Sequence, residues 1–118
     1  MVTTPAYVPR RGDAVWIDFN PQAGHEQAGR RPAVVLSPRA YNEKTGLAIL
    51  CPVTSRVKGY PFEVEIPAGL ELTGVILADQ LKSVDWRARS ASLIASLPSA
   101  AVDAVLERVG LLLARDDG

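Results

Sequence analysis

The sequence comprises 118 residues, of which 47% are hydrophobic and 22% charged, and its 13 basic and 13 acidic side chains give a net charge of zero. This length fits a single domain whose core needs no disulfide or metal to hold it together. No run approaches the roughly 18 apolar residues that cross a bilayer, and residues 1–12 lack the apolar segment of a signal peptide. We therefore expect one cytoplasmic domain over residues 1–118, with a loose N-terminal arm over residues 1–12.

Charge is unevenly distributed along the chain. Residues 1–60 carry eight lysines and arginines against four acidic residues, whereas the remainder carries five against nine. A protein with no net charge can therefore still present a basic face. A mixed, solvated surface is the alternative that these counts leave open.

Short apolar runs predict strands in the first half of the chain. Residues 14–19 are rich in β-branched and aromatic side chains and predict the first strand. Residues 21–30 form a long loop, and long loops in compact domains are often functional. Residues 31–37 enclose a continuous apolar run, which is typical of a strand buried on both faces. A single helical turn is expected over residues 37–42, with Ser37 as its cap.

The second half continues in short strands. Residues 47–53 predict an apolar strand, and residues 54–60 a polar, basic loop. Residues 62–66 alternate strictly between apolar and polar, as in a half-exposed strand. Residues 74–82 predict one further strand, and residues 86–90 a short final one.

A C-terminal helix is predicted over residues 98–114, opened by Pro98. Its apolar residues recur three and four positions apart and form one stripe: Val102, Val105, Leu106, Val109, Leu112 and Leu113. Five to seven short antiparallel strands, followed by one helix that covers the sheet, favour a mainly β fold, a small β-barrel, over a βαβ fold.

The reactive side chains exclude several classes of site. One histidine, His25, and one cysteine, Cys51, fall short of the three or four ligands of a zinc site. No HExxH motif, EF-hand loop or P-loop occurs, and no GxSxG elbow accompanies His25 for a Ser–His–Asp triad. Cys51 lies within an apolar run, where a buried and inert thiol is expected. We therefore expect neither a metal nor a cofactor.

One reaction class needs none of these groups. RNA carries its own nucleophile, the ribose 2′-hydroxyl, so an enzyme that cuts it needs a proton acceptor, a proton donor and positive charge at the phosphate. Glutamate, threonine and arginine can supply all three. The first half of the chain holds these residue types in its predicted loops.

Five ordered segments carry a resemblance to a known family. Residues 24–38 read Gly-His-Glu-Gln-Ala-Gly-Arg-Arg-Pro followed by an apolar strand, and they resemble the loop between the first two strands of the MazF toxins. Residues 12–19 resemble the opening strand of that family, and residues 51–55 its second catalytic segment. Residues 58–64 and 77–89 are similar to further segments, so the resemblance covers nearly the whole chain.

The resemblance implies an SH3-like barrel of the CcdB/PemK type, with the C-terminal helix packed on the sheet, working as a homodimer. It implies sequence-specific, metal-independent cleavage of single-stranded RNA, chiefly mRNA. The expected products carry 2′,3′-cyclic phosphate and 5′-hydroxyl ends, and the expected outcome is inhibition of translation and growth. A cognate antitoxin, MazE-like, acidic and partly disordered, would wrap the dimer and block the site.

The resemblance makes Arg31, Thr54 and Glu26 the catalytic residues. The Arg31 guanidinium can hold a phosphate with two hydrogen bonds and stabilise developing charge. Thr54 can donate a hydrogen bond to a phosphoryl oxygen. Glu26 can either accept the proton of the 2′-hydroxyl or organise the arginine electrostatically. Taken singly, a salt bridge for Arg31 and simple strand formation for Thr54 are the alternatives.

Further residues are weaker candidates for RNA contact, because aromatic stacking and basic side chains are the usual means of gripping single strands. The set comprises His25, Gln27, Arg30, Phe19, Ser55, Arg56, Lys58, Asp79, Gln80, Lys82, Arg87 and Arg89. For Phe19 and Trp16, core packing is equally compatible with the sequence.

One departure from related toxins bears on the mechanism. The Kid and PemK toxins carry an arginine–aspartate pair on the strand that here reads Leu77-Ala78-Asp79-Gln80. Asp79 is present, but Leu77 occupies the arginine position. This disfavours the Kid-type pair and favours the Arg31–Thr54 arrangement, with Asp79 left to read a base or hold the loop.

Two alternatives belong to other functional classes. A non-catalytic, CcdB-like toxin of the same barrel type would poison gyrase by protein–protein contact and would have no need of Glu26, Arg31 and Thr54. An inactive SH3-like binding module would gather aromatic side chains on one face, and aromatic residues make up only 6% of this chain.

Overall fold

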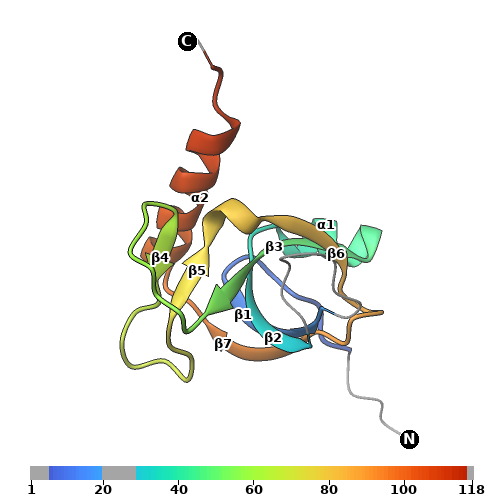
Figure 1. Ribbon diagram of the computed structural model, residues 1–118. Helices are drawn as coiled ribbons and strands as arrows, with labels where there is room; N and C mark the ends of the chain where they lie inside the picture. Colours follow the sequence, from blue (N-terminus) through green and yellow to red (C-terminus); the bar gives the residue numbers. More distant parts are fainter. Residues whose placement is uncertain (1–5, 20–28, 117–118) are drawn as a thin grey trace, which may run out of the picture.

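The structure, a computed structural model, describes residues 6–19 and 29–116. Within these ranges seven strands form one strongly curved antiparallel sheet, and a C-terminal helix lies against it (Figure 1). The elements in chain order are β1 (Asp13–Asp18), β2 (Arg30–Val35), α1 (Arg39–Thr45), β3 (Leu47–Thr54), β4 (Glu63–Glu65), β5 (Val75–Leu77), the 3₁₀ turn η1 (Ala78–Gln80), β6 (Lys82–Asp85), β7 (Ser92–Ser96) and α2 (Ser99–Leu113). The predicted mainly β fold with a C-terminal helix is confirmed.

The central strand of the sheet is β3. The strand order is β4-β5-β3-β2-β1-β7, and β6 also pairs with β3. Along one edge β3 pairs with β2, while its other edge is shared by β6 at the start of the strand and β5 at its end. The prediction of one strand over residues 74–82 is therefore wrong. The turn η1 divides that segment, so that β5 and β6 pair with different parts of β3.

The position of the last strand also differs from the prediction. Residues 86–90, predicted as a strand, form a turn in which the Ala91 N–H donates to the Trp86 carbonyl at 3.0 Å and Ser90 has a φ of 53°. The final strand is β7, which pairs with β1. Its apolar run is only Leu93, Ile94 and Ala95, too short to stand out before its distant partner is known.

The helix after β2 is longer than predicted and begins differently. Instead of one turn over residues 37–42, α1 runs to Thr45, Pro38 holds the N-cap position, and no side chain caps the helix. Ser37 instead accepts a hydrogen bond from the Ile49 N–H at 2.8 Å. The fully buried Asn42 anchors the helix by donating to the Pro9 carbonyl at 2.9 Å. The helix ends where Gly46, with a φ of 73°, adopts the left-handed conformation and donates its N–H to the Asn42 carbonyl.

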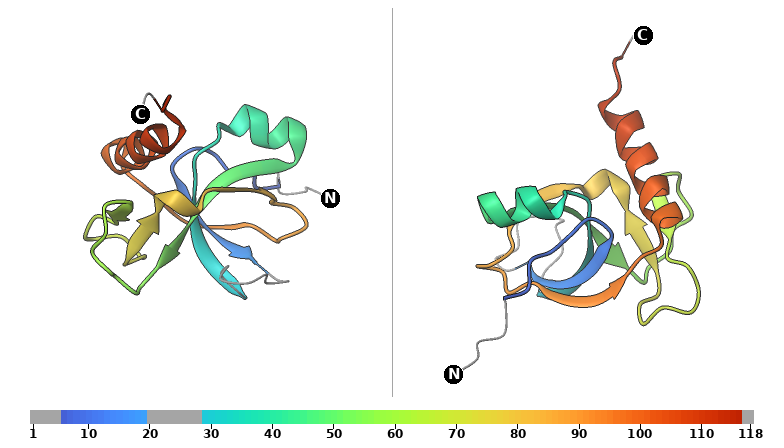
Figure 2. Two further views of the ribbon diagram at one scale, coloured as in Figure 1. Left: turned by 45° about the horizontal axis from the view of Figure 1, so that its top comes forward. Right: turned by 180° about the vertical axis from the view of Figure 1, so that it is seen from behind.

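Apolar side chains fill both faces of the sheet, as the continuous run in β2 predicts. Val34 packs in the cluster beneath α2, with Cys51 and Val105, whereas Val35 packs on the opposite face. On α2 the predicted apolar stripe is buried only in its first part. Its end, with Leu113 74% exposed, extends beyond the sheet (Figure 2).

The described part of the N-terminal arm, residues 6–12, lies against the sheet. Pro9 is fully buried, and the Arg11 guanidinium donates to the Leu36 carbonyl at 2.6 Å. Of the two helices described, neither has the length and apolar character to cross a membrane.

Candidate active site

Two strand ends bring Arg31 and Thr54 to the same place. The antiparallel register of β2 and β3 pairs Ala33 with Pro52 and Val35 with Leu50. Continuing this register toward the ends of the strands sets Arg31 opposite Thr54. Both residues lie where a strand leaves the core, so their side chains reach solvent while the backbone beneath them is held in the sheet.

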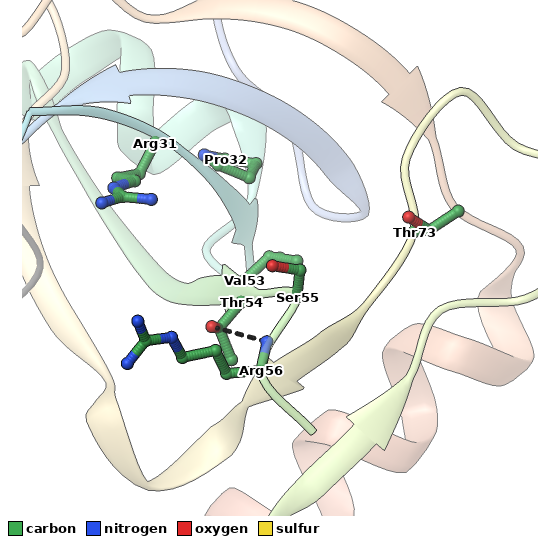
Figure 3. A pocket seen from close by; sticks show the side chains of 7 residues that line it. All are labelled: Arg31, Pro32, Val53, Thr54, Ser55, Arg56 and Thr73. Carbon is green, nitrogen blue, oxygen red and sulfur yellow. Dashed lines mark hydrogen bonds between the residues drawn. The ribbon is translucent and has the colours of Figure 1, made fainter. Parts of the chain in front are cut away.

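A cavity of about 430 Å³ opens at this point (Figure 3). Its lining residues are Arg31, Pro32, Val53, Thr54, Ser55, Arg56 and Thr73. We call it the first cavity. Two arginines and three hydroxyl side chains make it suited to an anionic group such as a phosphate.

The Thr54 hydroxyl has a defined orientation. Its oxygen accepts a hydrogen bond from the backbone N–H of Arg56 at 3.1 Å. A hydroxyl carries one hydrogen and two lone pairs, so this contact uses a lone pair and leaves the hydrogen to donate to another acceptor. Figure 3 shows the hydroxyl pointing to the side of the cavity on which the guanidinium groups of Arg31 and Arg56 lie. The arrangement can therefore direct one neutral donor and two positive charges at a single anion.

A second cavity, of about 470 Å³, adjoins the first and shares Thr54 and Arg56 with it. Its other lining residues are Lys58, Tyr60, Glu63, Leu77 and Gln80. This second cavity combines a basic edge with an amide and an aromatic ring, which are groups that can hold a nucleobase and its phosphate.

Hydrogen bonds hold the wall of the second cavity in shape. The Glu63 carboxylate accepts from the backbone N–H groups of Lys58 at 3.0 Å and Gly59 at 2.8 Å. The Tyr60 hydroxyl donates to Asp79 at 2.8 Å. Burial, and then this hydrogen bond to a carboxylate, raise the pKa of Tyr60 to about 12. The phenol therefore keeps its proton and stays a donor at neutral pH.

Several predicted contact residues lie outside the lining of both cavities. Arg30 donates to the Ser90 carbonyl at 2.9 Å and to the Ser92 hydroxyl at 2.8 Å, while Arg89 donates to the Asp18 carbonyl at 2.9 Å. Through these hydrogen bonds, the two arginines hold the end of β1 and the start of β2 in place.

Three further candidates take part in cation–π contacts. Phe19 is 4% exposed, with the Lys82 ammonium 5.1 Å from its ring centroid, and Arg87 lies 4.8 Å from the ring of Trp86. The burial of Phe19 supports core packing, whereas Trp16 is 41% exposed. His25, Glu26 and Gln27 lie outside the described residues.

Sequence reasoning did not single out Tyr60, Glu63 or Thr73 as site residues. Glu63 is the polar half of an alternating strand and Tyr60 the end of a basic loop, and the family resemblance over residues 58–64 assigns neither side chain a role. Trp16 was also not placed near the site, although it pairs with Pro32 of the first cavity across β1 and β2. The alternation of β1 could have indicated that Trp16 faces away from its buried neighbours Val15 and Ile17.

Cys51 is buried in the core, as predicted. Burial, and then the nearby Asp79 charge, raise the pKa of its thiol to about 12, so the reactive thiolate is scarce at neutral pH. Within residues 6–19 and 29–116, no three side chains of the histidine, cysteine, aspartate and glutamate types gather into a set that could hold a metal.

Residues 10–113 match the family described as PemK-like, MazF-like toxin of type II toxin–antitoxin systems. The chain belongs to this family. It is 49% identical over 107 residues to the endoribonuclease toxin MazF of Escherichia coli K12, covering 91% of this chain and 96% of that protein. It is 33% identical over 108 residues to the E. coli endoribonuclease PemK, covering 87% of this chain and 80% of that one.

Solved structures of MazF proteins share the fold. The crystal structure of MazF from Deinococcus radiodurans superposes with a TM-score of 0.88 at 57% identity, covering 92% of this chain and 98% of that one. A MazE–MazF structure from the same organism superposes with a TM-score of 0.83 at 50% identity, covering 94% of this chain and all of the matched chain. The alternative of a non-catalytic, CcdB-like toxin is not favoured, because the E. coli relatives MazF and PemK are named endoribonucleases.

Proposed function

We propose that this chain is a metal-independent endoribonuclease toxin that cuts single-stranded RNA in the first cavity. One observation carries the proposal: Thr54, with a proton to donate, shares that cavity with Arg31 and Arg56. Relatives at 49% and 33% identity that are named endoribonucleases support the same assignment.

The reaction is an attack by RNA on its own backbone. The ribose 2′-oxygen forms a bond to phosphorus, and the bond from phosphorus to the 5′-oxygen of the next nucleotide breaks. The proton of the 2′-hydroxyl passes to a base, and the leaving 5′-oxygen takes up a proton. The products carry a 2′,3′-cyclic phosphate and a 5′-hydroxyl, and atoms balance without added water.

The described residues stabilise the phosphorane-like transition state. The Arg31 guanidinium binds two phosphoryl oxygens, and Thr54 donates its hydroxyl hydrogen to one of them. Arg56 adds a second positive charge from the same cavity. Since negative charge grows on these oxygens during the attack, such contacts strengthen in the transition state. Glu26 serves either as the proton acceptor or as the electrostatic organiser of Arg31.

Neighbouring nucleotides occupy the second cavity. The Gln80 amide can both donate and accept at the edge of a base, while Arg56 and Lys58 meet the backbone. Ser55 continues this polar surface from the first cavity. His25, Gln27 and Asp79 complete the set of contacts that select the sequence. Messenger RNA is the substrate, and its cleavage stops translation and growth.

A second copy of the chain and an antitoxin are the protein partners. An apolar groove of about 340 Å³ lies between α1 and α2, which sit on the same side of the molecule (Figure 2). Tyr41, Leu81, Leu106 and Leu113 are among its lining residues. The second copy covers this groove. An acidic, MazE-like antitoxin binds the basic loops around Arg31 and Arg56 and blocks the site, and the pair works in the cytoplasm.

The test is incubation of the purified protein with a long single-stranded RNA in excess EDTA. We expect cleavage at a few short sequences, with 2′,3′-cyclic phosphate ends identified by mass spectrometry. Cleavage that vanishes in EDTA and returns with magnesium would overturn the metal-independent mechanism. Gyrase inhibition without RNA cleavage would support the CcdB-like alternative, and no activity in either assay would support a binding module.

A further inference from the structure

Gly74 stands immediately before β5, beside the end of β3. The register pairs Val75 with Thr54 and Ile76 with Val53, so Gly74 lies one residue beyond the last pair of these two strands. Its φ is 119°, a conformation that side chains of L-residues rarely adopt. On its other side, the Gly74 carbonyl accepts a hydrogen bond from the Ile66 N–H at 3.0 Å.

The backbone of Gly74 touches the backbone that carries Thr54. A Cβ atom built on Gly74 would overlap the Thr54 carbonyl oxygen, lie 3.0 Å from the Thr54 carbonyl carbon and lie 3.4 Å from the Ser55 Cα. All three are main-chain atoms, which cannot rotate away as the end of a flexible side chain does. Any side chain at Gly74 must therefore displace the peptide between Thr54 and Ser55.

That peptide is part of the turn that orients the catalytic hydroxyl. The Thr54 Oγ1 accepts from the Arg56 N–H, and the displaced peptide lies between these two groups in the chain. Gly74 cannot readily move away from Thr54, because its carbonyl is hydrogen-bonded to Ile66. Ile66 is 5% exposed and packs in the core cluster beneath α2. A Cβ at Gly74 therefore moves Thr54 relative to Arg31.

We infer that Gly74 is a positioning residue for the proposed RNA cleavage: its lack of a side chain sets the place of the Thr54 hydroxyl. The inference rests on the proposed function of the first cavity. A misplacement of about 1 Å in a catalytic group can cost roughly 100-fold in rate. Gly74→Ala should accordingly lower kcat roughly 10- to 100-fold. KM should stay within about threefold, because Arg31, which lies on the neighbouring strand β2, is not displaced.

Gly69→Ala is the matched control. Gly69 has a φ of 92°, so alanine meets a similar backbone strain, yet a Cβ there would find nothing within 4 Å. We expect Gly69→Ala to cleave at nearly the parent rate. Equal loss of kcat in both variants would overturn the inference, because strain at a positive φ would then explain it.

A double variant separates positioning of Thr54 from general damage. In a Thr54→Ala background there is no hydroxyl to misplace, so adding Gly74→Ala should lower the residual rate by less than about twofold. If Gly74→Ala lowers the rate by the same factor with and without Thr54, Gly74 acts on the fold at large and the inference fails.

A readout without RNA keeps this inference distinct from the proposed function. The amide resonance of Arg56 reports the hydrogen bond to Thr54 and should shift in Gly74→Ala but not in Gly69→Ala. A parent protein that does not cleave RNA would refute the proposed function, while an unshifted Arg56 amide in Gly74→Ala would refute the positioning role.

If Gly74→Ala does not fold, Thr73→Gly combined with Gly74→Ala replaces it. The added backbone freedom before residue 74 relieves strain but leaves the Cβ beside Thr54. This pair is compared with Thr73→Gly alone. A folded pair that cleaves as fast as Thr73→Gly would overturn the inference.

Discussion

The hydroxyl of Tyr60 lies 2.8 Å from Oδ1 of Asp79, and this hydrogen bond joins the loop after β3 to the turn η1. The bond connects two segments that flank the second cavity, with Leu77 and Gln80 on one side and Lys58 on the other. In the RNA cleavage that we propose, this hydrogen bond keeps the second cavity in shape before RNA binds, so that less ordering accompanies binding.

The Tyr60 phenol should ionise near pH 12 rather than near its ordinary value of 10.0. Because the pKa of this phenol is higher in the folded state, its contribution to the free energy of unfolding is fully present below pH 10. That contribution is lost as the pH rises through about 12. Ultraviolet difference titration of the parent and of Tyr60→Phe isolates this group. Asp79→Asn should lower its pKa. A Tyr60 that ionises near pH 10 in the parent would show that the bond to Asp79 does not form in solution.

Arg31→Ala and Thr54→Ala should each abolish most cleavage while leaving the fold intact, because both side chains reach solvent at strand ends. Loss of one preorganised donor at a developing charge costs about 2.7–4 kcal/mol, or roughly 100- to 1,000-fold in rate. Arg31→Lys should also fail, since an ammonium cannot make the two-pronged contact. Thr54→Ser keeps the hydroxyl and should retain partial activity.

The measurement is the initial cleavage rate on a short single-stranded RNA, with circular dichroism to check folding. A folded Arg31→Ala that cuts within about threefold of the parent, well short of the loss expected for a missing donor, would show that the first cavity is not the active site. His25 and Asp79 would then be the next residues to replace.

Cys51→Ala should cleave at nearly the parent rate. The thiol is buried, its Sγ lies 3.8 Å from the Ala78 carbonyl oxygen, and its pKa is raised to about 12. The lost packing should lower the free energy of unfolding by about 1 kcal/mol. Thiol-reactive reagents should label the parent slowly at pH 8 and rapidly once it is denatured. Rapid labelling of the native protein, accompanied by loss of activity, would instead indicate a catalytic role for the thiol.

Leu113→Glu should weaken the proposed homodimer, because Leu113 lines the apolar groove and a carboxylate there loses its water when a second copy covers it. Leu111→Glu is the matched control, since Leu111 is 67% exposed on the same helix and is not among the lining residues of the groove. Sedimentation equilibrium should show dissociation at least about tenfold stronger for Leu113→Glu. A monomeric parent, or equal effects of both changes, would rule out this groove as the dimer interface.

Patterns that record burial over a few residues were sufficient to predict much of the fold. The apolar run from Ala33 to Leu36 indicates a strand covered on both faces, and the spacing of Val102, Val105 and Val109 indicates the face that α2 buries. Arg31 and Thr54 could be named as candidates from the sequence because each lies in a segment that resembles the MazF family. These inferences hold because side-chain periodicity follows directly from backbone geometry.

Only the tertiary structure decided how distant segments meet. It divided residues 74–82 at η1, since the two halves pair with different parts of β3, and it assigned β7 through its pairing with β1. It also set Tyr60 against Asp79 and Gly74 against Thr54. No local pattern carries these relationships, because strand partners, long-range hydrogen bonds and backbone close contacts depend on the path of the whole chain.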